Sequence, residues 1–67
     1  MDLLINGSTV NVPKKVETIT ELMQHLELKS PVIIVEYNDE ILKKDEYKQT
    51  NINNGDKVEF IQFVGGG

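Results

Sequence analysis

Cysteine is absent from all 67 residues of this chain. Its absence excludes disulfide bonds, thiolate metal sites and a cysteine nucleophile, and it leaves no thiol that could attack an activated group on the same molecule. Arginine is absent too, so the seven basic residues are all lysines, and they stand against eleven acidic residues for a net charge of −4. This acidic balance argues against a nucleic-acid or other phosphate-binding surface and favours protein partners with basic faces.

Long apolar segments are missing as well. No run is long enough to span a bilayer and no secretory hydrophobic region is present, so we expect no membrane association and a cytoplasmic location. A chain of this length forms one small domain, which buries only about 60% of the surface that its unfolded chain exposes. Little room remains for a deep active site, and we therefore expect a protein that presents a surface and is not itself an enzyme.

Three of the five glycines stand together at positions 65–67, directly after a segment with strand character. Glycine lets the main chain approach another surface closely, so Gly65, Gly66 and Gly67 are predicted to form a thin tail that enters a partner's active site. We expect a folded domain over residues 1–64 and a flexible tail over 65–67, with the Gly67 carboxylate as its reactive group. The alternatives are a frayed end without function and a remnant of protein production.

The N-terminal part of the chain predicts a β-hairpin followed by one helix. Apolar residues 3–5 precede Asn6-Gly7, a strong hairpin turn signal, and residues 9–12 alternate polar and apolar side chains as a half-buried strand does. A capping box at residues 18–21 marks the start of a helix, which should stop before Ser30-Pro31 because a residue preceding proline disfavours helical geometry. The apolar stripe of this helix, expected to face a sheet, comprises Ile19, Leu22, Met23 and Leu26.

The C-terminal part predicts further strands separated by sharp turns. The β-branched run 32–35 is typical of a buried strand. Turn signals at Asn38-Asp39 and Asn54-Gly55-Asp56 enclose a short apolar pair, Ile41-Leu42, and a charged, turn-rich stretch around Tyr47.

Residues 57–64 are predicted to form the last strand. Period-two alternation places Val58 and Phe60 in the core beneath the helix, and one helix covers only one face of a sheet. Apolar side chains on the other face should lie exposed beside the tail, where they would form a contact surface; alternatively, the last aromatic residue folds back over the sheet edge. The predicted partner interface comprises Ile61, Phe63 and Val64.

Other residues with chemical potential are interpreted as solvated surface. His25 has no cysteine or second histidine to join it in a metal site, and the adjacent acids and lysines lie in polar, turn-like segments. We predict no metal site and no catalytic residue in this chain. The residues set aside in this way are His25, Asp39-Glu40, Asp45-Glu46, Lys14-Lys15 and Lys43-Lys44.

The order of these segments carries a resemblance that spans the whole chain. The hairpin, the helix and the β-branched strand are followed by Val-Glu-Tyr-Asn-Asp-Glu-Ile at 35–41 and by Ile-Gln-Phe-Val-Gly-Gly-Gly at 61–67. In this arrangement the chain resembles the ThiS family, the sulfur carrier proteins of thiamine biosynthesis. The resemblance is most specific from Gly55-Asp56 to Gly67, where the spacing from turn to terminus and the Gly66-Gly67 ending both fit; Gly65 adds a third glycine where a carrier needs two.

The resemblance implies an α+β fold of the β-grasp, ubiquitin-like type. In that fold a mixed sheet of four to five strands wraps one helix, and the first and last strands pair in parallel at the centre. The resemblance also implies that a ThiF-type enzyme uses ATP to adenylate the Gly67 carboxylate. Sulfur-delivery proteins then convert it into a thiocarboxylate, which donates sulfur to thiazole synthase, ThiG.

The residues are compatible with this chemistry. A terminal carboxylate is ionised at neutral pH, and its negative charge makes it a poor electrophile, so activation must come from outside. The chain has no phosphate-binding loop for ATP, because its glycine run lacks the lysine and hydroxyl residue of such a loop. We therefore expect no cofactor bound by this chain, with ATP held by the activating partner and the carrier acting as a co-substrate.

The sequence is compatible with two other interpretations. One is the small subunit of molybdopterin synthase, a β-grasp carrier with the same terminal chemistry, although such chains are usually longer and have an additional helical segment. The other is an interaction module that works through its sheet face and whose terminus is never modified. In each case we expect a monomer when the chain is alone.

Overall fold

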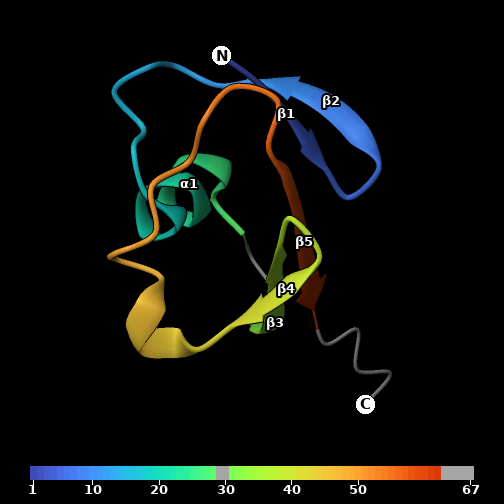
Figure 1. Ribbon diagram of the computed structural model, residues 1–67, viewed down its shortest axis with the longest axis vertical. Helices are drawn as coiled ribbons and strands as arrows, with labels where there is room; N and C mark the ends of the chain where they lie inside the picture. The colour runs from blue at the N-terminus through green and yellow to red at the C-terminus, as the bar shows by residue number, and fades with distance from the viewer. Residues whose placement is uncertain (29–30, 63–67) are drawn as a thin grey trace.

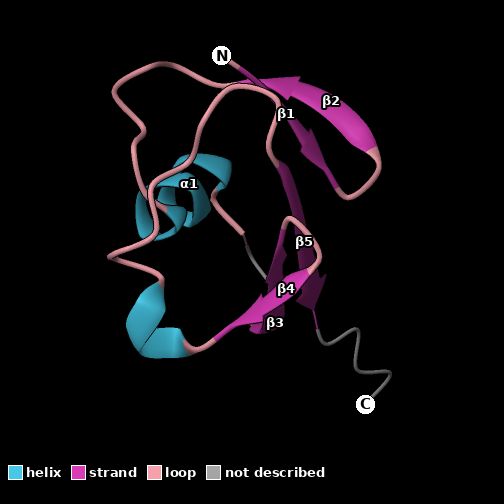
Figure 2. Ribbon diagram, in the orientation of Figure 1, coloured by secondary structure: helices cyan, strands magenta, loops and turns pink. Residues whose placement is uncertain are grey.

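The computed structural model describes residues 1–28 and 31–62. In this part of the chain a five-stranded sheet of order β2-β1-β5-β3-β4 packs beside one α-helix (Figures 1 and 2). The central pair, β1 and β5, is parallel, and the other pairs are antiparallel. The elements are β1 Asp2–Ile5, β2 Ser8–Asn11, α1 Ile19–Leu26, β3 Val32–Tyr37, β4 Glu40–Leu42, a 3₁₀ helix Lys44–Glu46 and β5 Lys57–Gln62.

The predicted N-terminal hairpin is confirmed. β1 and β2 pair from Asp2↔Asn11 to Ile5↔Ser8, and the two residues between them have positive φ angles of 47° at Asn6 and 84° at Gly7. A two-residue turn with positive φ at both positions matches the twist of the flanking strands and favours the Asn-Gly pair.

The helix begins as the capping box predicts. The Thr18 side chain accepts a hydrogen bond from the Glu21 N–H at 3.2 Å, and the Glu21 carboxylate accepts one from the Thr18 N–H at 3.1 Å. The helix ends at Leu26, where Glu27 caps it in a left-handed conformation with φ 50°, so it stops well before Pro31. A loop bond from the Ile19 N–H to the Thr50 carbonyl, 3.1 Å long, ties the first turn to the segment that runs beside it (Figure 1).

The core lies between α1 and one face of the sheet. Ile19 and Leu22 are fully buried on the helix, and Val58 on β5 is fully buried beneath them; Phe60 is 4% exposed. Met23 and Leu26 are partly buried against the same cluster. The predicted stripe and the alternation of the last strand are thus both confirmed.

The prediction of a buried strand at 32–35 is right in type and only partly right in burial. Val35 is fully buried, but Ile34 is only half-buried. The reason is that the helix covers one face of the sheet, so alternate side chains of β3 point to the other face. The last strand reaches Gln62 within the described residues, and its predicted continuation to Val64 lies outside them.

Both C-terminal turns are present. Asn38 and Asp39 have φ angles of 48° and 70° at the turn between β3 and β4, and Gly55 has φ 89° before β5. The stretch around Tyr47 forms the short 3₁₀ helix and turns. The arrangement of one helix on a mixed sheet with a parallel central pair is the β-grasp fold expected from the sequence.

Candidate functional site

The predicted site follows from β5, the strand that leads toward the C-terminus. β5 lies between β1 and β3, and its inward side chains are anchored in the core. Its last described residue, Gln62, stands three positions before the first of the three terminal glycines. The predicted residues Phe63, Val64, Gly65, Gly66 and Gly67 lie outside the described residues, so their roles remain predictions.

Ile61 lies on the sheet face that the helix leaves uncovered. It is 40% exposed and pairs with the half-buried Ile34 on β3. Alternation along the neighbouring strands puts Leu4 and Ile41, both exposed, on the same side. We call this uncovered side of the sheet the open face. The predicted exposure of Ile61 is confirmed, and its role as a partner contact remains a prediction.

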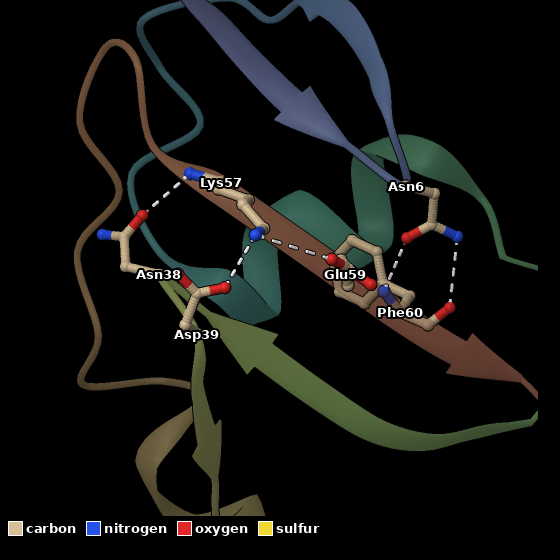
Figure 3. Close-up of polar contacts among 6 residues, drawn as sticks. All are labelled: Asn6, Asn38, Asp39, Lys57, Glu59 and Phe60. Atoms are coloured by element: carbon tan, nitrogen blue, oxygen red, sulfur yellow. Dashed lines mark hydrogen bonds and ion pairs between the residues drawn. The ribbon is translucent and has the colours of Figure 1, made fainter.

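A group of charged side chains lies on β3 and β5 of the open face and in the turn between β3 and β4. The Lys57 ammonium lies 2.7 Å from the Asp39 carboxylate and 4.0 Å from that of Glu59 (Figure 3), and Glu36 stands directly opposite Glu59 in the ladder. The hydrogen bond and the charge of Asp39 raise the pKa of Lys57. Three carboxylates against one ammonium leave this group with a net charge of −2, which suits a basic partner surface.

Asp56 links the turn before β5 to the end of β3. Its carboxylate accepts a hydrogen bond from the Tyr37 hydroxyl, one from the Asn53 N–H at 2.7 Å and one from the Asn38 side-chain amide at 3.3 Å. Burial, followed by the hydrogen bond and negative charge of Asp56, raises the pKa of Tyr37. The hydrogen bond between Tyr37 and Asp56 joins the end of β3 to the residue directly before β5 and so fixes where β5 begins.

Sequence reasoning found the turn at Asn54-Gly55-Asp56 but missed the role of Tyr37. The only local signal is that Asp56 belongs to the turn, because aspartate side chains often hydrogen-bond to neighbouring main-chain groups. Sequence reasoning also assigned Asn6 to the hairpin turn alone, whereas its side chain bonds to the main chain of Phe60 (Figure 3).

The residues set aside from the sequence are placed on the surface. His25 is exposed, as are the paired acids at 39–40 and 45–46 and the paired lysines. In the described ranges, no three histidine or acidic side chains gather in a way that could hold a metal ion. No helix in this part of the chain is long and apolar enough to cross a membrane.

The fold and its central C-terminal strand place the chain in the class of small β-grasp proteins. The chain belongs to the ThiS family, whose model matches residues 3–67. The sulfur carrier protein ThiS of Bacillus subtilis (strain 168) is 37% identical over 65 residues, covering 97% of this chain and 98% of that protein. A crystal structure of the thiamine biosynthesis protein (ThiS) from Geobacter metallireducens superimposes with a TM-score of 0.84 at 35% identity, with complete coverage of both chains.

A second kind of relative is much longer than this chain. A thiazole synthase of Paramagnetospirillum magneticum (strain ATCC 700264 / AMB-1) is 40% identical over 67 residues, which are all of this chain and 20% of that protein. A ThiS-like segment therefore occurs within a longer polypeptide named for thiazole synthesis.

Proposed function

We propose that this chain carries sulfur in thiamine biosynthesis as a thiocarboxylate on Gly67 and delivers it to thiazole formation. Membership of the ThiS family is the observation that supports the sulfur-carrier role, because the match extends through the glycine tail. The absence of cysteine supports Gly67 as the site of sulfur attachment. Since the chain has no cysteine, the terminal carboxylate is the group best suited to accept a transferable sulfur atom.

Activation belongs to a partner of the ThiF type. The Gly67 carboxylate attacks the α-phosphorus of ATP, pyrophosphate leaves, and an acyl adenylate forms. Hydrosulfide, or its equivalent from a delivery protein, attacks the acyl carbon, and AMP leaves. The product is a thiocarboxylate, whose polarisable sulfur is the nucleophile for the next step. This chain supplies the carboxylate, which is the nucleophile toward ATP and, once adenylated, the electrophile toward sulfur, and the partner supplies the nucleotide site. The carrier is therefore a co-substrate of an ATP-dependent reaction, which we place in the cytoplasm.

The acceptor of the sulfur is a thiazole synthase. Support comes from the relative named thiazole synthase, part of which resembles this entire chain. Residues 65–67 would enter the acceptor's active site, because a run of glycines has no side chains to obstruct a narrow channel.

The open face is the surface that we assign to docking, with Ile61 near the tail as its apolar contact. Ile61 is 40% exposed and precedes Phe63 and Val64, the other two members of the proposed interface. The acidic group around Lys57 lies on the same face and favours a basic partner. Apolar contact and charge complementarity together would set the orientation in which the tail leaves the domain.

A reconstitution experiment tests this function. The protein is incubated with a ThiF-type enzyme, ATP and sodium sulfide, alkylated with a thiol reagent, and mapped by fragment mass spectrometry. Fragment mapping is needed because replacing oxygen by sulfur adds nearly the same mass as oxidising Met1 or Met23 to the sulfoxide. We expect an ATP-dependent adduct on Gly67, followed by loss of the adduct when thiazole synthase and its other substrates are added.

A tail deletion provides the matched control. We expect a variant without Gly66 and Gly67 to fold like the parent chain, with the same circular dichroism spectrum and thermal midpoint, while labelling and growth without thiamine are lost. An unlabelled terminus with a demonstrably active partner, or full growth of the truncated variant, would instead favour an interaction module. A labelled terminus that thiazole synthase cannot discharge would favour the molybdopterin pathway.

A further inference from the structure

Asn6 connects the first turn of the chain to its last strand. Its side-chain oxygen accepts a hydrogen bond from the Phe60 N–H at 2.7 Å, and its side-chain nitrogen donates one to the Phe60 carbonyl at 3.2 Å. Its own main-chain N–H donates to the Val58 carbonyl at 3.1 Å. One residue thus makes three hydrogen bonds to β5. Figure 3 shows the two that reach Phe60, 54 positions away in sequence.

The side-chain amide replaces a missing strand residue. β1 ends at Ile5, which pairs with Val58, and the chain then turns back into the hairpin with Asn6 at φ 47°. No further residue of β1 is therefore available to pair with Phe60. The carboxamide of asparagine has the same donor and acceptor as a peptide unit, and here it occupies the place of one.

Phe60 is a point at which β5 is held from both sides. On the β3 side it pairs with Val35, on the β1 side it is bonded to Asn6, and its ring is 4% exposed. Gly67 follows seven residues later, so an extended segment reaches at most roughly 25 Å from this anchor. Without the Asn6 side chain Phe60 loses both of these bonds, and the main-chain bond at Val58, two residues earlier, remains.

We propose that Asn6 is a positioning residue for the sulfur-transfer reaction, which acts by holding β5 in place at Phe60, seven residues before the reacting group of Gly67. This inference rests on the proposed function of Gly67. The terminus must reach ATP in a partner's active site, and small errors in the position of a reacting group lower rates steeply. Asn6 acts only through the strand and does not touch the reacting atoms.

The test compares Asn6→Gly with Gly7→Ala. Glycine at position 6 tolerates the positive φ and removes only the amide. Alanine at position 7 keeps Asn6 and strains the same turn, since Gly7 has φ 84°, but no atom lies within 4 Å of the added Cβ. The pair separates loss of the Asn6 bonds from loss of hairpin stability. Asn6→Asp is a third variant, which keeps the acceptor for the Phe60 N–H and replaces the donor by an oxygen.

For Asn6→Gly we expect faster amide hydrogen exchange at Phe60 and a kcat for ATP-dependent thiocarboxylation that is lower by roughly 10- to 100-fold. The KM for the carrier should change by less than about threefold, because the open face is intact. Asn6→Asp should fall between parent and Asn6→Gly, and Gly7→Ala should keep the parent kcat even if its thermal midpoint falls further.

Two results would overturn the positioning role: an unchanged kcat in Asn6→Gly, or equal losses of kcat in Asn6→Gly and Gly7→Ala. Failure of the proposed function has a different signature, since the parent chain itself would then show no adduct on Gly67. In that case amide hydrogen exchange at Phe60 still tests whether the Asn6 side chain holds β5. Unchanged protection of the Phe60 N–H in Asn6→Gly would refute this role.

Discussion

The Tyr37 hydroxyl donates a hydrogen bond to the Asp56 carboxylate and thereby joins the end of β3 to the turn that starts β5. The two residues are 19 positions apart. Asp56 also holds the Asn53 N–H of its own turn, so a single carboxylate stabilises both the turn and the attachment of that turn to the sheet.

This relationship predicts a coupled loss of stability. Asp56→Ala should lower the free energy of unfolding by about 1–3 kcal/mol, because it leaves several donors without their acceptor, whereas Tyr37→Phe should cost about 1 kcal/mol. The double variant should lose less than the sum of the two, since each change removes the shared bond. Urea unfolding measures all three, with Tyr47→Phe as a control for removing a phenol that does not contact Asp56. Strict additivity would show that the bond contributes nothing.

The same contact predicts a dependence on alkaline pH. The folded-state pKa of Tyr37 is raised by burial and by Asp56, so the folded protein holds this proton more tightly than the unfolded chain does. The resulting stability is complete below the ordinary tyrosine pKa of about 10 and is lost as pH rises through the folded value. The pKa of Lys57 is raised as well. Its contribution to stability therefore also declines at alkaline pH, and it does so whether or not Tyr37 is present.

Comparison of the parent chain with Tyr37→Phe isolates the tyrosine. Between about pH 9 and 11 the parent should lose stability more steeply than the variant, as measured by urea midpoints at each pH. Parallel curves over this range would contradict the prediction.

The fold could be predicted because its signals are local or periodic. Asn6-Gly7 specifies the hairpin, Thr18 and Glu21 specify the helix start, and the alternation of Val58 and Phe60 identifies the core side of β5. The parallel pairing of the first and last strands came from the resemblance to a family and not from any of these patterns. Local signals and family likeness together were sufficient for the β-grasp architecture.

The details that sequence reasoning missed depend on contacts between distant positions. Nothing near Asn6 in sequence indicates that its amide meets Phe60, and nothing near Tyr37 indicates Asp56. Ile34 was included in a buried run because β-branched residues on both sides of a strand look alike, whereas burial depends on which face the helix covers. The glycine tail was assigned a role from composition and resemblance, and that role stays a prediction.

Charge on the open face predicts an effect on partner association. Glu36 faces Glu59 directly, and like charges in this position are unfavourable, so Glu36→Gln should raise the free energy of unfolding by up to about 0.5 kcal/mol. If the docking surface is recognised by a basic partner, the same change should slow association at low salt and weaken its salt dependence. Stopped-flow binding to the ThiF-type enzyme measures both, with Glu27→Gln beyond the helix as the charge-matched control. Equal effects of the two variants would indicate attraction to net charge alone.

Ile61 provides the corresponding test of apolar contact. Because its side chain is 40% exposed, Ile61→Ser should reduce stability by less than the roughly 2–5 kcal/mol expected for truncating a buried core residue such as Leu22. An apolar anchor at a protein interface contributes more than its exposure suggests, and its loss costs 1–2 kcal/mol or more, so the Kd for the activating enzyme should rise by about tenfold. Isothermal titration calorimetry with Ile61→Ser and with Ile41→Ser compares two exposed isoleucines of the open face, only one of which lies on the strand leading to the tail. A Kd unchanged in Ile61→Ser but raised in Ile41→Ser would move the contact surface to the β4 side of the sheet, away from the exit of the tail.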